Sequence, residues 1–321
     1  TVRPVIGCLL PLSGNFAPYG TRMKQGMELA AQGSRLELQF QDCPNDPYQA
    51  TRTVQKLSQD PGVLALLGPL TSGDAQAAAQ AAQDSGIPLI ALSQKQNLTE
   101  ARPLVFQVFL TPRLQVRALL RYTLGERGLQ RYAIFAPDSA YGRAMSKVFG
   151  EELVVQGGIL VTQATYPSGN KDFTTVLSPL LTAFQPGTEG GSTFDALFIP
   201  DDAVTVAAIA AQTAQSPLGK VQFLGTNLAK PRADSLDTTQ ALEGILFPDA
   251  FFNNDPNPAV QNFVTAYRQR YGTEPEYLAA QGYMVVRLLT HLLESPTPVD
   301  RKEMPQKLMS LRDIPHLPWF K

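Results

Sequence analysis

Hydroxyl and aromatic side chains stand in loops between predicted strands and helices, where they could hold a small polar molecule. Ser72 directly precedes a predicted helix, and a helix N-terminus can receive an anion such as a carboxylate. Serine is also a common helix cap, so both interpretations stay open. Tyr19 and Tyr141 each precede a glycine in such a loop, and each could form a pocket wall or pack on a surface.

Acidic side chains occupy further loops of this kind. Asp138, Asp201 and Asp202 follow predicted strands and could pair with a ligand ammonium group. Aspartate is equally common as a loop and cap residue, so position alone does not separate the two roles.

Residues for common catalytic and cofactor sites are sparse. With His291 and His316 as the two histidines, neither a histidine triad nor a zinc cluster can be assembled. The stretch 11–14, PLSG, has too few glycines to hold a pyrophosphate, and no Walker-type loop occurs. No spacing singles out a pair of carboxylates as acid and base. We therefore expect a protein that is not an enzyme and that has no cofactor or metal ion.

Composition narrows the class further. A chain of 321 residues suggests two domains, at about 150 residues each. The net charge of −1, with scattered Lys and Arg, argues against nucleic acid as a partner.

No apolar run approaches the roughly 20 residues that span a bilayer. Because the chain starts at Thr1 without a signal peptide, we expect a mature or trimmed form. Cys8 and Cys43 are offset on neighbouring predicted strands, which disfavours a disulfide.

Strand and helix patterns alternate along the chain. In the first part we expect strands at Val5–Leu10, Leu36–Gln41, Val63–Leu67 and Ile87–Leu92, and helices at Thr21–Gln32, Pro47–Gln59 and Ser72–Ser85. In the second part we expect strands at Tyr132–Ala136, Ile159–Thr165, Ala196–Ile199 and Gln222–Gly225, and helices at Leu114–Arg127, Tyr141–Gln156, Asp172–Phe184 and Ala203–Thr213. This order predicts α/β architecture, with two doubly wound parallel sheets and right-handed crossovers.

The two series define two lobes. The N-terminal lobe is expected to comprise 1–110 and 251–300, because helices at Pro258–Tyr271 and Glu276–Leu293 return to cover it. The C-terminal lobe comprises 111–250, and 301–321 could be added to it. Hinge segments are expected near 105–112 and 244–250. Since ligands of open parallel sheets bind beyond the carboxyl ends of the strands, we expect a site in a cleft between the lobes.

Several stretches together resemble type I periplasmic binding proteins of the branched-chain amino-acid group. The stretch IGCLLPLSGNFAPYGTRMKQGMELA resembles the family's opening of an apolar strand, P-L-[ST]-G, then Y-G and a helix. The likeness continues through LLGPLTSGDAQAAAQAAQDSGIPLIALS and DSAYGRAMSKVFGEEL, and resumes at FVTAYRQRYGTEPEYLAAQGYMVVRLL. The resemblance implies two Rossmann-like lobes joined by hinge strands. It also implies ligand delivery to an ABC importer and a periplasmic or extracytoplasmic location, with a lipid anchor upstream of Thr1 left open.

The resemblance also assigns roles to residues. Tyr19 looks like the family's aromatic wall, Ser72 like the hydroxyl that holds the ligand carboxylate, and Tyr141 like the aromatic contact of the second lobe. The candidate ligand-binding residues are Ser13, Tyr19, Leu70, Ser72, Ser93, Gln94, Lys95, Tyr141, Asp201, Asp202 and Asn227.

Two positions depart from the family pattern. Lys95 replaces a threonine, and its larger cationic side chain would alter or block the pocket. Asn227 is neutral where amino-acid binders often place a carboxylate for the ligand ammonium, which puts leucine-like specificity in doubt. Asp201 or Asp202 could supply the missing charge. An amino acid or a related carboxylate is the expected ligand, with peptides, aromatic acids and short-chain organic acids also open.

A second resemblance leads to a different function. The stretch LEGILFPDAFFNNDPNPAVQNFVTAYRQRYGTEPE is similar to envelope lipoproteins that activate penicillin-binding proteins, in which this fold serves protein contact. The partner is then either the membrane subunits of an ABC importer or a penicillin-binding protein.

Overall fold

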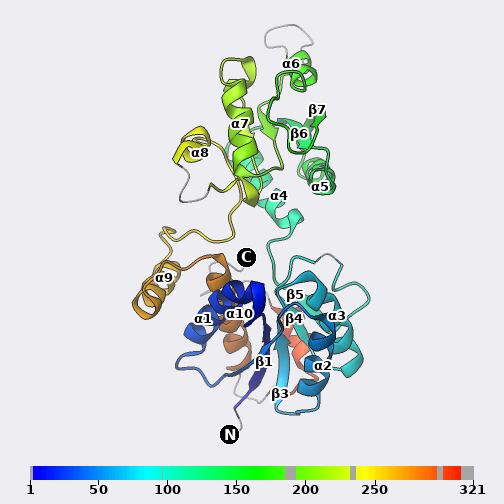
Figure 1. Ribbon diagram of the computed structural model, residues 1–321, viewed down its shortest axis with the longest axis vertical. Coiled ribbons are helices and arrows are strands. Elements are labelled where there is room, and N and C mark those ends of the chain that lie inside the picture. The colour runs from blue at the N-terminus through cyan, green and yellow to red at the C-terminus, as the bar shows by residue number, and fades with distance from the viewer. Residues whose placement is uncertain (1–2, 96, 185–192, 232–235, 295–298, 312–321) are drawn as a thin grey trace. The chain divides into compact units, whose positions relative to one another are not determined.

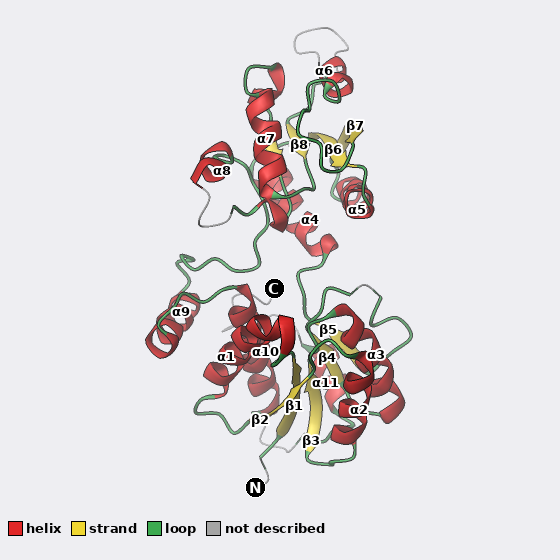
Figure 2. Cartoon of the chain, viewed as in Figure 1, coloured by secondary structure: helices red, strands yellow, loops and turns green. Residues whose placement is uncertain are grey.

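The computed structural model describes residues 3–95, 97–184, 193–231, 236–294 and 299–311 (Figures 1 and 2). By its internal contacts the chain divides into two compact units. Unit 1 comprises Thr1–Phe109 and Phe251–Lys321, and unit 2 comprises Leu110–Ala250. Each unit contains one sheet in which every paired strand is parallel, which confirms the expected α/β class.

The sheet of unit 1 has the strand order β2-β1-β3-β4-β5. Its strands are β1 (Val5–Leu10), β2 (Glu37–Asp42), β3 (Val63–Leu67), β4 (Leu89–Ala91) and β5 (Val105–Gln107). Within the segment predicted as a hinge, residues 105–107 form β5 and pair with β4, so this part belongs to the sheet.

Helices cover both faces of this sheet, because its strands carry apolar side chains on both faces. The helices of unit 1 are α1 (Ala17–Ala31), α2 (Pro47–Ser58), α3 (Ser72–Ser85), α9 (Pro258–Tyr271), α10 (Tyr277–Leu293) and α11 (Met304–Ser310), and a short 3₁₀ turn spans Gly14–Phe16. Ile6, Cys8 and Leu10 of β1 pack with residues of α1 and α10. Leu9 of the same strand packs with α2 and α3 on the opposite face.

The C-terminal stretch packs on unit 1. Arg301 donates hydrogen bonds to the carbonyl oxygens of Ser58 at 2.7 Å and Val63 at 2.9 Å, at the amino end of β3. Residues 301–311 therefore lie with unit 1 and not with the other lobe, while 312–321 lie outside the described residues.

Unit 2 repeats the architecture with the strand order β7-β6-β8-β9. Its strands are β6 (Arg131–Pro137), β7 (Ile159–Tyr166), β8 (Ala196–Phe198) and β9 (Gln222–Leu224), and its helices are α4 (Pro112–Leu120), α5 (Ala140–Val155), α6 (Ser178–Ala183), α7 (Ala203–Thr213) and α8 (Leu236–Ala241). On one face Phe149 of α5 stacks on Phe198 of β8, with ring centroids 4.2 Å apart. On the other face Phe135, Tyr166 and Phe173 pack together.

Two predicted helices of unit 2 differ from those observed. The prediction of one helix over Asp172–Phe184 is wrong, because α6 begins only at Ser178. Pro179 lacks an N–H donor and would clash with the preceding turn, so it is tolerated only in the first turn of a helix. The helix predicted to start at Leu114 begins at Pro112, where the Thr111 side chain caps it, and continues from Arg121 as a π-helical segment.

The two cysteines are free and buried. Cys8 lies inside β1, whereas Cys43 follows β2 and donates its backbone N–H to the carbonyl oxygen of Leu10 at 2.8 Å. The expected offset between the two thiols is therefore present. Across the described ranges, no helix combines the length and apolar character that a membrane crossing requires.

The closest helix contact in unit 1 generates a stability prediction. Gly26 of α1 lies against the backbone of α10, so that an added Cβ would stand 1.9 Å from the carbonyl oxygen of Ala279. We expect Gly26→Ala to destabilise the protein by about 1–3 kcal/mol, because the two helix backbones must separate. Gly150 of α5 has open space around its Cα, so Gly150→Ala is the matched control and should stabilise slightly. Urea unfolding measures both, and an unchanged stability of Gly26→Ala would contradict the packing.

Candidate functional site

Each sheet reverses its strand order beside its first strand. In unit 1 the reversal lies between β1 and β3, and in unit 2 it lies between β6 and β8. At such a point the loops that leave the two strands diverge to opposite faces of the sheet and leave a crevice at its carboxyl edge. The crevice of each unit is therefore the first place to look for a ligand site.

In unit 1 this place contains a cavity of about 430 Å³. Its walls come from the loops after β1, β2, β3 and β4, with additions from the segment after β5 and from α10. The lining residues are Pro11, Phe16, Tyr19, Asn45, Leu70, Thr71, Ser72, Gly73, Leu92, Gln94, Phe109 and Leu278. Most of these side chains are apolar or aromatic, the rest are neutral and polar, and the volume suits a small molecule.

The start of α3 supplies hydrogen-bond donors to this cavity. The first N–H groups of any helix lack intrahelical acceptors, and the side chain of the N-cap residue Thr71 accepts none of them. Ser72 and Gly73 are exposed and line the cavity. In contrast, Asp46 caps α2 by accepting from the N–H groups of Tyr48 and Gln49. The open start of α3 is thus suited to a carboxylate.

Asp42 at the end of β2 holds the loop after β1. Its Oδ1 accepts from the backbone N–H groups of Leu12 at 2.8 Å and Ser13 at 3.2 Å, and its Oδ2 accepts from the Ser13 hydroxyl. Gly20 then lets α1 approach this loop, since a Cβ there would lie 1.9 Å from the carbonyl oxygen of Pro11. Ser13 therefore braces the loop and is not among the residues that line the cavity.

The loop after β4 is held by two neighbouring side chains. The buried Ser93 hydroxyl accepts from the backbone N–H of Lys95 at 3.2 Å. Gln107 donates from its amide to the carbonyl oxygens of Ser93 at 2.5 Å and Lys95 at 2.9 Å. This arrangement presents Gln94 to the cavity, while the Lys95 side chain is exposed beside it and does not line it.

The first turn of α3 contains a buried acid. Asp74 is fully buried, and its Oδ2 accepts from the backbone N–H of Asn45 at 3.0 Å. Burial raises the pKa of Asp74 in spite of this hydrogen bond, because a carboxylate loses hydration there.

Of the residues predicted for the site in unit 1, Tyr19, Leu70, Ser72 and Gln94 line the cavity. Their part in ligand binding stays a prediction. Phe16 was missed, although it belongs to the same loop as Tyr19 and could have been found from that position.

Phe109 and Leu278 carried no signal in the sequence. Leu278 lies on α10, which reaches this place only by packing on α1. Phe109 is held by the same helix, since Gln281 donates to the carbonyl oxygen of Val108 at 2.5 Å and the Phe109 ring meets Tyr277 edge-on. Both walls therefore depend on contacts between distant parts of the chain.

The reversal point of unit 2 carries Tyr141 at the start of α5. Its hydroxyl donates to Thr226 Oγ1 at 3.0 Å, and burial raises the pKa of Tyr141. Asn227 follows Thr226 and donates its backbone N–H to the side-chain oxygen of Gln115 at 3.0 Å.

The two aspartates after β8 are engaged within unit 2. Asp201 accepts from the Tyr166 hydroxyl at 2.7 Å and from the backbone N–H of Asp202 at 2.8 Å. Asp202 is the N-cap of α7 and accepts from the backbone N–H of Thr205 at 2.8 Å. Both carboxylates thus have structural partners, and their role toward a ligand stays a prediction.

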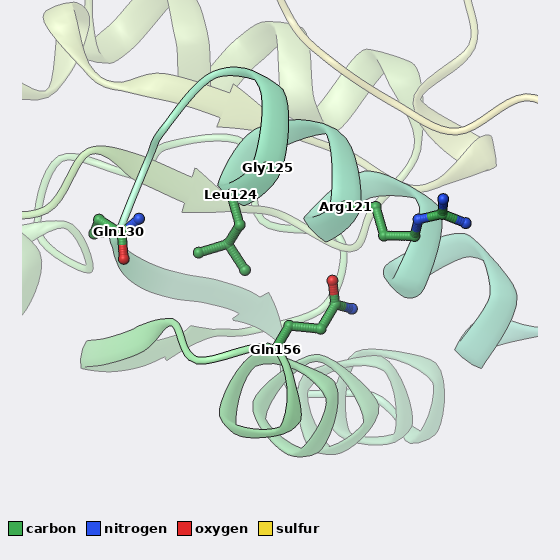
Figure 3. A pocket seen from close by; sticks show the side chains of 5 residues that line it. All are labelled: Arg121, Leu124, Gly125, Gln130 and Gln156. Atoms are coloured by element: carbon green, nitrogen blue, oxygen red, sulfur yellow. The ribbon is translucent and has the colours of Figure 1, made fainter.

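A second cavity of about 440 Å³ lies in unit 2 at the amino edge of its sheet (Figure 3). It is lined by Arg121, Leu124, Gly125, Gln130 and Gln156. Leu124 from the π-helical segment and Gln156 from the end of α5 point toward each other across it (Figure 3). Because it lies away from the strand-end loops and has one apolar wall residue, we do not place the ligand there.

Comparison with known proteins gives consistent matches. A family model described as "Periplasmic binding protein" matches residues 4–318. The Leu/Ile/Val-binding protein homolog 7 of Brucella abortus (strain 2308) is 25% identical over 293 residues, which cover 84% of this chain and 71% of that protein. A solved structure from Rhodospirillum rubrum, assigned to branched-chain amino acid ABC transport, has a TM-score of 0.82 at 23% identity and covers 95% of this chain and 88% of its own. The ABC transporter substrate-binding protein from Desulfitobacterium hafniense in complex with Leu has a TM-score of 0.66 at 26% identity, with the same coverage of 95% and 88%.

The buried acid generates a prediction about pH. Because the pKa of Asp74 is raised in the folded protein, stability should fall as pH rises from the unfolded pKa of about 4 through the folded value. Asp74→Asn keeps an oxygen for the Asn45 N–H but cannot ionise. We therefore expect its stability relative to the parent to increase from pH 4 to pH 7 in urea unfolding. Asp84→Asn, at an exposed position of the same helix, is the control. A relative stability that is the same at both pH values would contradict the assignment.

Proposed function

The chain belongs to the family of periplasmic binding proteins, and on this premise we propose that it captures a small carboxylate in the cavity of unit 1 for delivery to an ABC importer. An amino acid or a related organic acid is the proposed class of ligand. Proteins of this family bind solutes and are not enzymes, which confirms the expected absence of catalysis.

The observation that carries the proposal is the open start of α3 in the cavity wall. Donors from Ser72 and Gly73 face a space whose other walls are mainly apolar and aromatic. Such a combination suits a molecule with a carboxylate at one end and an apolar group at the other, since the N–H groups and the helix dipole favour the negative charge. Tyr19 and Phe16, with ring centroids 6.2 Å apart, supply an aromatic wall for the apolar end.

The relatives support solute transport in preference to the second hypothesis, contact with a penicillin-binding protein. The solved protein from Desulfitobacterium hafniense was crystallised with Leu, and the relative from Brucella abortus is named as a Leu/Ile/Val-binding homolog. The alternative of an envelope module that contacts a penicillin-binding protein is not favoured by these matches. A periplasmic location is consistent with the family.

The proposal predicts a measurable binding defect for a cavity residue. We expect Tyr19→Ala to weaken binding of the carboxylate ligand at least tenfold, because the variant loses an aromatic wall. Ser72→Ala should weaken it about fivefold, by the loss of one hydrogen bond of about 1 kcal/mol. Tyr48→Ala is the matched control, since Tyr48 is 70% exposed on α2 and does not line the cavity.

Isothermal titration calorimetry measures these effects, after a thermal-shift screen of amino acids and organic acids has identified a ligand. A ligand at 100 times its dissociation constant should raise stability by about 2.7 kcal/mol. Before the screen, denatured protein is examined by mass spectrometry for a ligand retained through purification. If no acid shifts the melting temperature and none is retained, or if Tyr19→Ala binds as tightly as the parent, the proposal fails.

A further inference from the structure

We propose that the ligand is a carboxylate without an ammonium group, such as a branched aliphatic or aryl-alkyl acid, and not a zwitterionic amino acid. This inference rests on the proposed function of the cavity in unit 1. It follows from how the chain uses its charged groups at the carboxyl edges of the two sheets.

The groups that line the cavity favour binding of an anion over binding of a cation. Among its described lining residues none is acidic, and the neutral polar side chains are those of Asn45, Thr71, Ser72 and Gln94. The free N–H groups at the start of α3 repel an ammonium group as they attract a carboxylate. An ammonium group held there would lose hydration without gaining a counter-ion, which is costly.

The acids nearest to this cavity are already engaged. Both oxygens of Asp42 accept from the loop after β1, including the Ser13 hydroxyl. Asp46 caps α2. Asp74 is buried in the first turn of α3, where its Oδ2 accepts from a backbone N–H. None of the three lines the cavity, and each already accepts from backbone N–H groups.

The acids at the strand ends of unit 2 also have partners within the protein. Asp138 forms an ion pair with Arg143 at 2.5 Å, Asp201 accepts from Tyr166, and Asp202 caps α7. After β9 the chain continues with Gly225, Thr226 and Asn227, all neutral. Binding of an amino acid whose ammonium group pairs with Asp201 or Asp202 is therefore less favourable than binding of a ligand that needs no such charge.

One cation lies close to the cavity in unit 1. Lys95 follows the lining residue Gln94, and its backbone is fixed on both sides by Ser93 and Gln107. In the described part of the chain, its ammonium group makes no ion pair. A positive charge on the residue that follows Gln94 favours a bound anion and disfavours an ammonium group.

Matched pairs of ligands test the inference. Leucine and 4-methylpentanoate differ only in the ammonium group, as do phenylalanine and 3-phenylpropanoate, and 3-methylbutylamine retains the ammonium group without the carboxylate. In calorimetry with the intact chain, we expect the acid of one pair to bind at least tenfold more tightly than its amino acid, and the amine not to bind. If an amino acid binds as tightly as its matched acid or more tightly, the inference is wrong while the proposed function stands. If none of the five binds, the wider thermal-shift screen gives no shift and no acid is retained from purification, the proposed function itself fails.

A variant tests the electrostatic part. Lys95→Gln should weaken binding of the acid about three- to tenfold, because it removes one nearby positive charge. Lys56→Gln is the control, since Lys56 is exposed in the last turn of α2. An equal loss in both variants, or no loss in Lys95→Gln, would contradict a local role for Lys95. Circular dichroism spectra of both variants exclude unfolding as the cause.

Discussion

Parallel pairing of the strands is the constraint on which the remaining features of this protein depend. Since neighbouring strands run in one direction, each needs a crossover to return, and every crossover helix begins at the same edge of the sheet. In unit 1 this brings the starts of α1 and α3 to either side of the place where the strand order reverses. The cavity lies at that place, with the aromatic wall from one loop and the helix donors from the other.

Both units brace the loop after their first strand with the same close contact. In unit 1 the Cα of Gly20 lies against the carbonyl group of Pro11. In unit 2 the Cα of Gly142 lies against the carbonyl group of Pro137, and a Cβ on Gly142 would be only 2.1 Å from that carbonyl oxygen. Gly68 directly follows β3 at φ +100°, and a Cβ there would lie 2.0 Å from the Leu9 carbonyl oxygen. These contacts hold each helix start close to its strand end, so the donors of α3 stand in a fixed place.

Acidic side chains hold several strand-end loops and helix starts, whereas the start of α3 has no side-chain cap. Asp46 and Asp202 cap α2 and α7 by accepting from backbone N–H groups, and Asp42 accepts from backbone N–H groups of the loop after β1. The start of α3 has a threonine in the N-cap place, and its side chain makes no cap bond. Because the uncapped start of α3 also lines the cavity, its free N–H groups are suited to an anion bound there.

Features that depend on neighbouring residues could be predicted from the sequence alone. Apolar runs and turn residues placed β1, β3 and α3, and the loop positions of Tyr19 and Ser72 placed both at the cavity, because a strand-to-helix loop in a parallel sheet must end at its carboxyl edge. Helix α6 was one exception, since Pro179 outweighed an otherwise helical pattern.

Only the tertiary structure decided which side chains are free to meet a ligand. The sequence placed Ser13, Ser93 and Asp202 in the right loops, yet Ser13 is bound to Asp42 and Asp202 to the start of α7. Leu278 joins the cavity from a helix more than 250 residues along the chain, because α10 packs on α1. A local sequence pattern predicts the path of the backbone. The partner of each side chain, in contrast, depends on which distant segments pack against it.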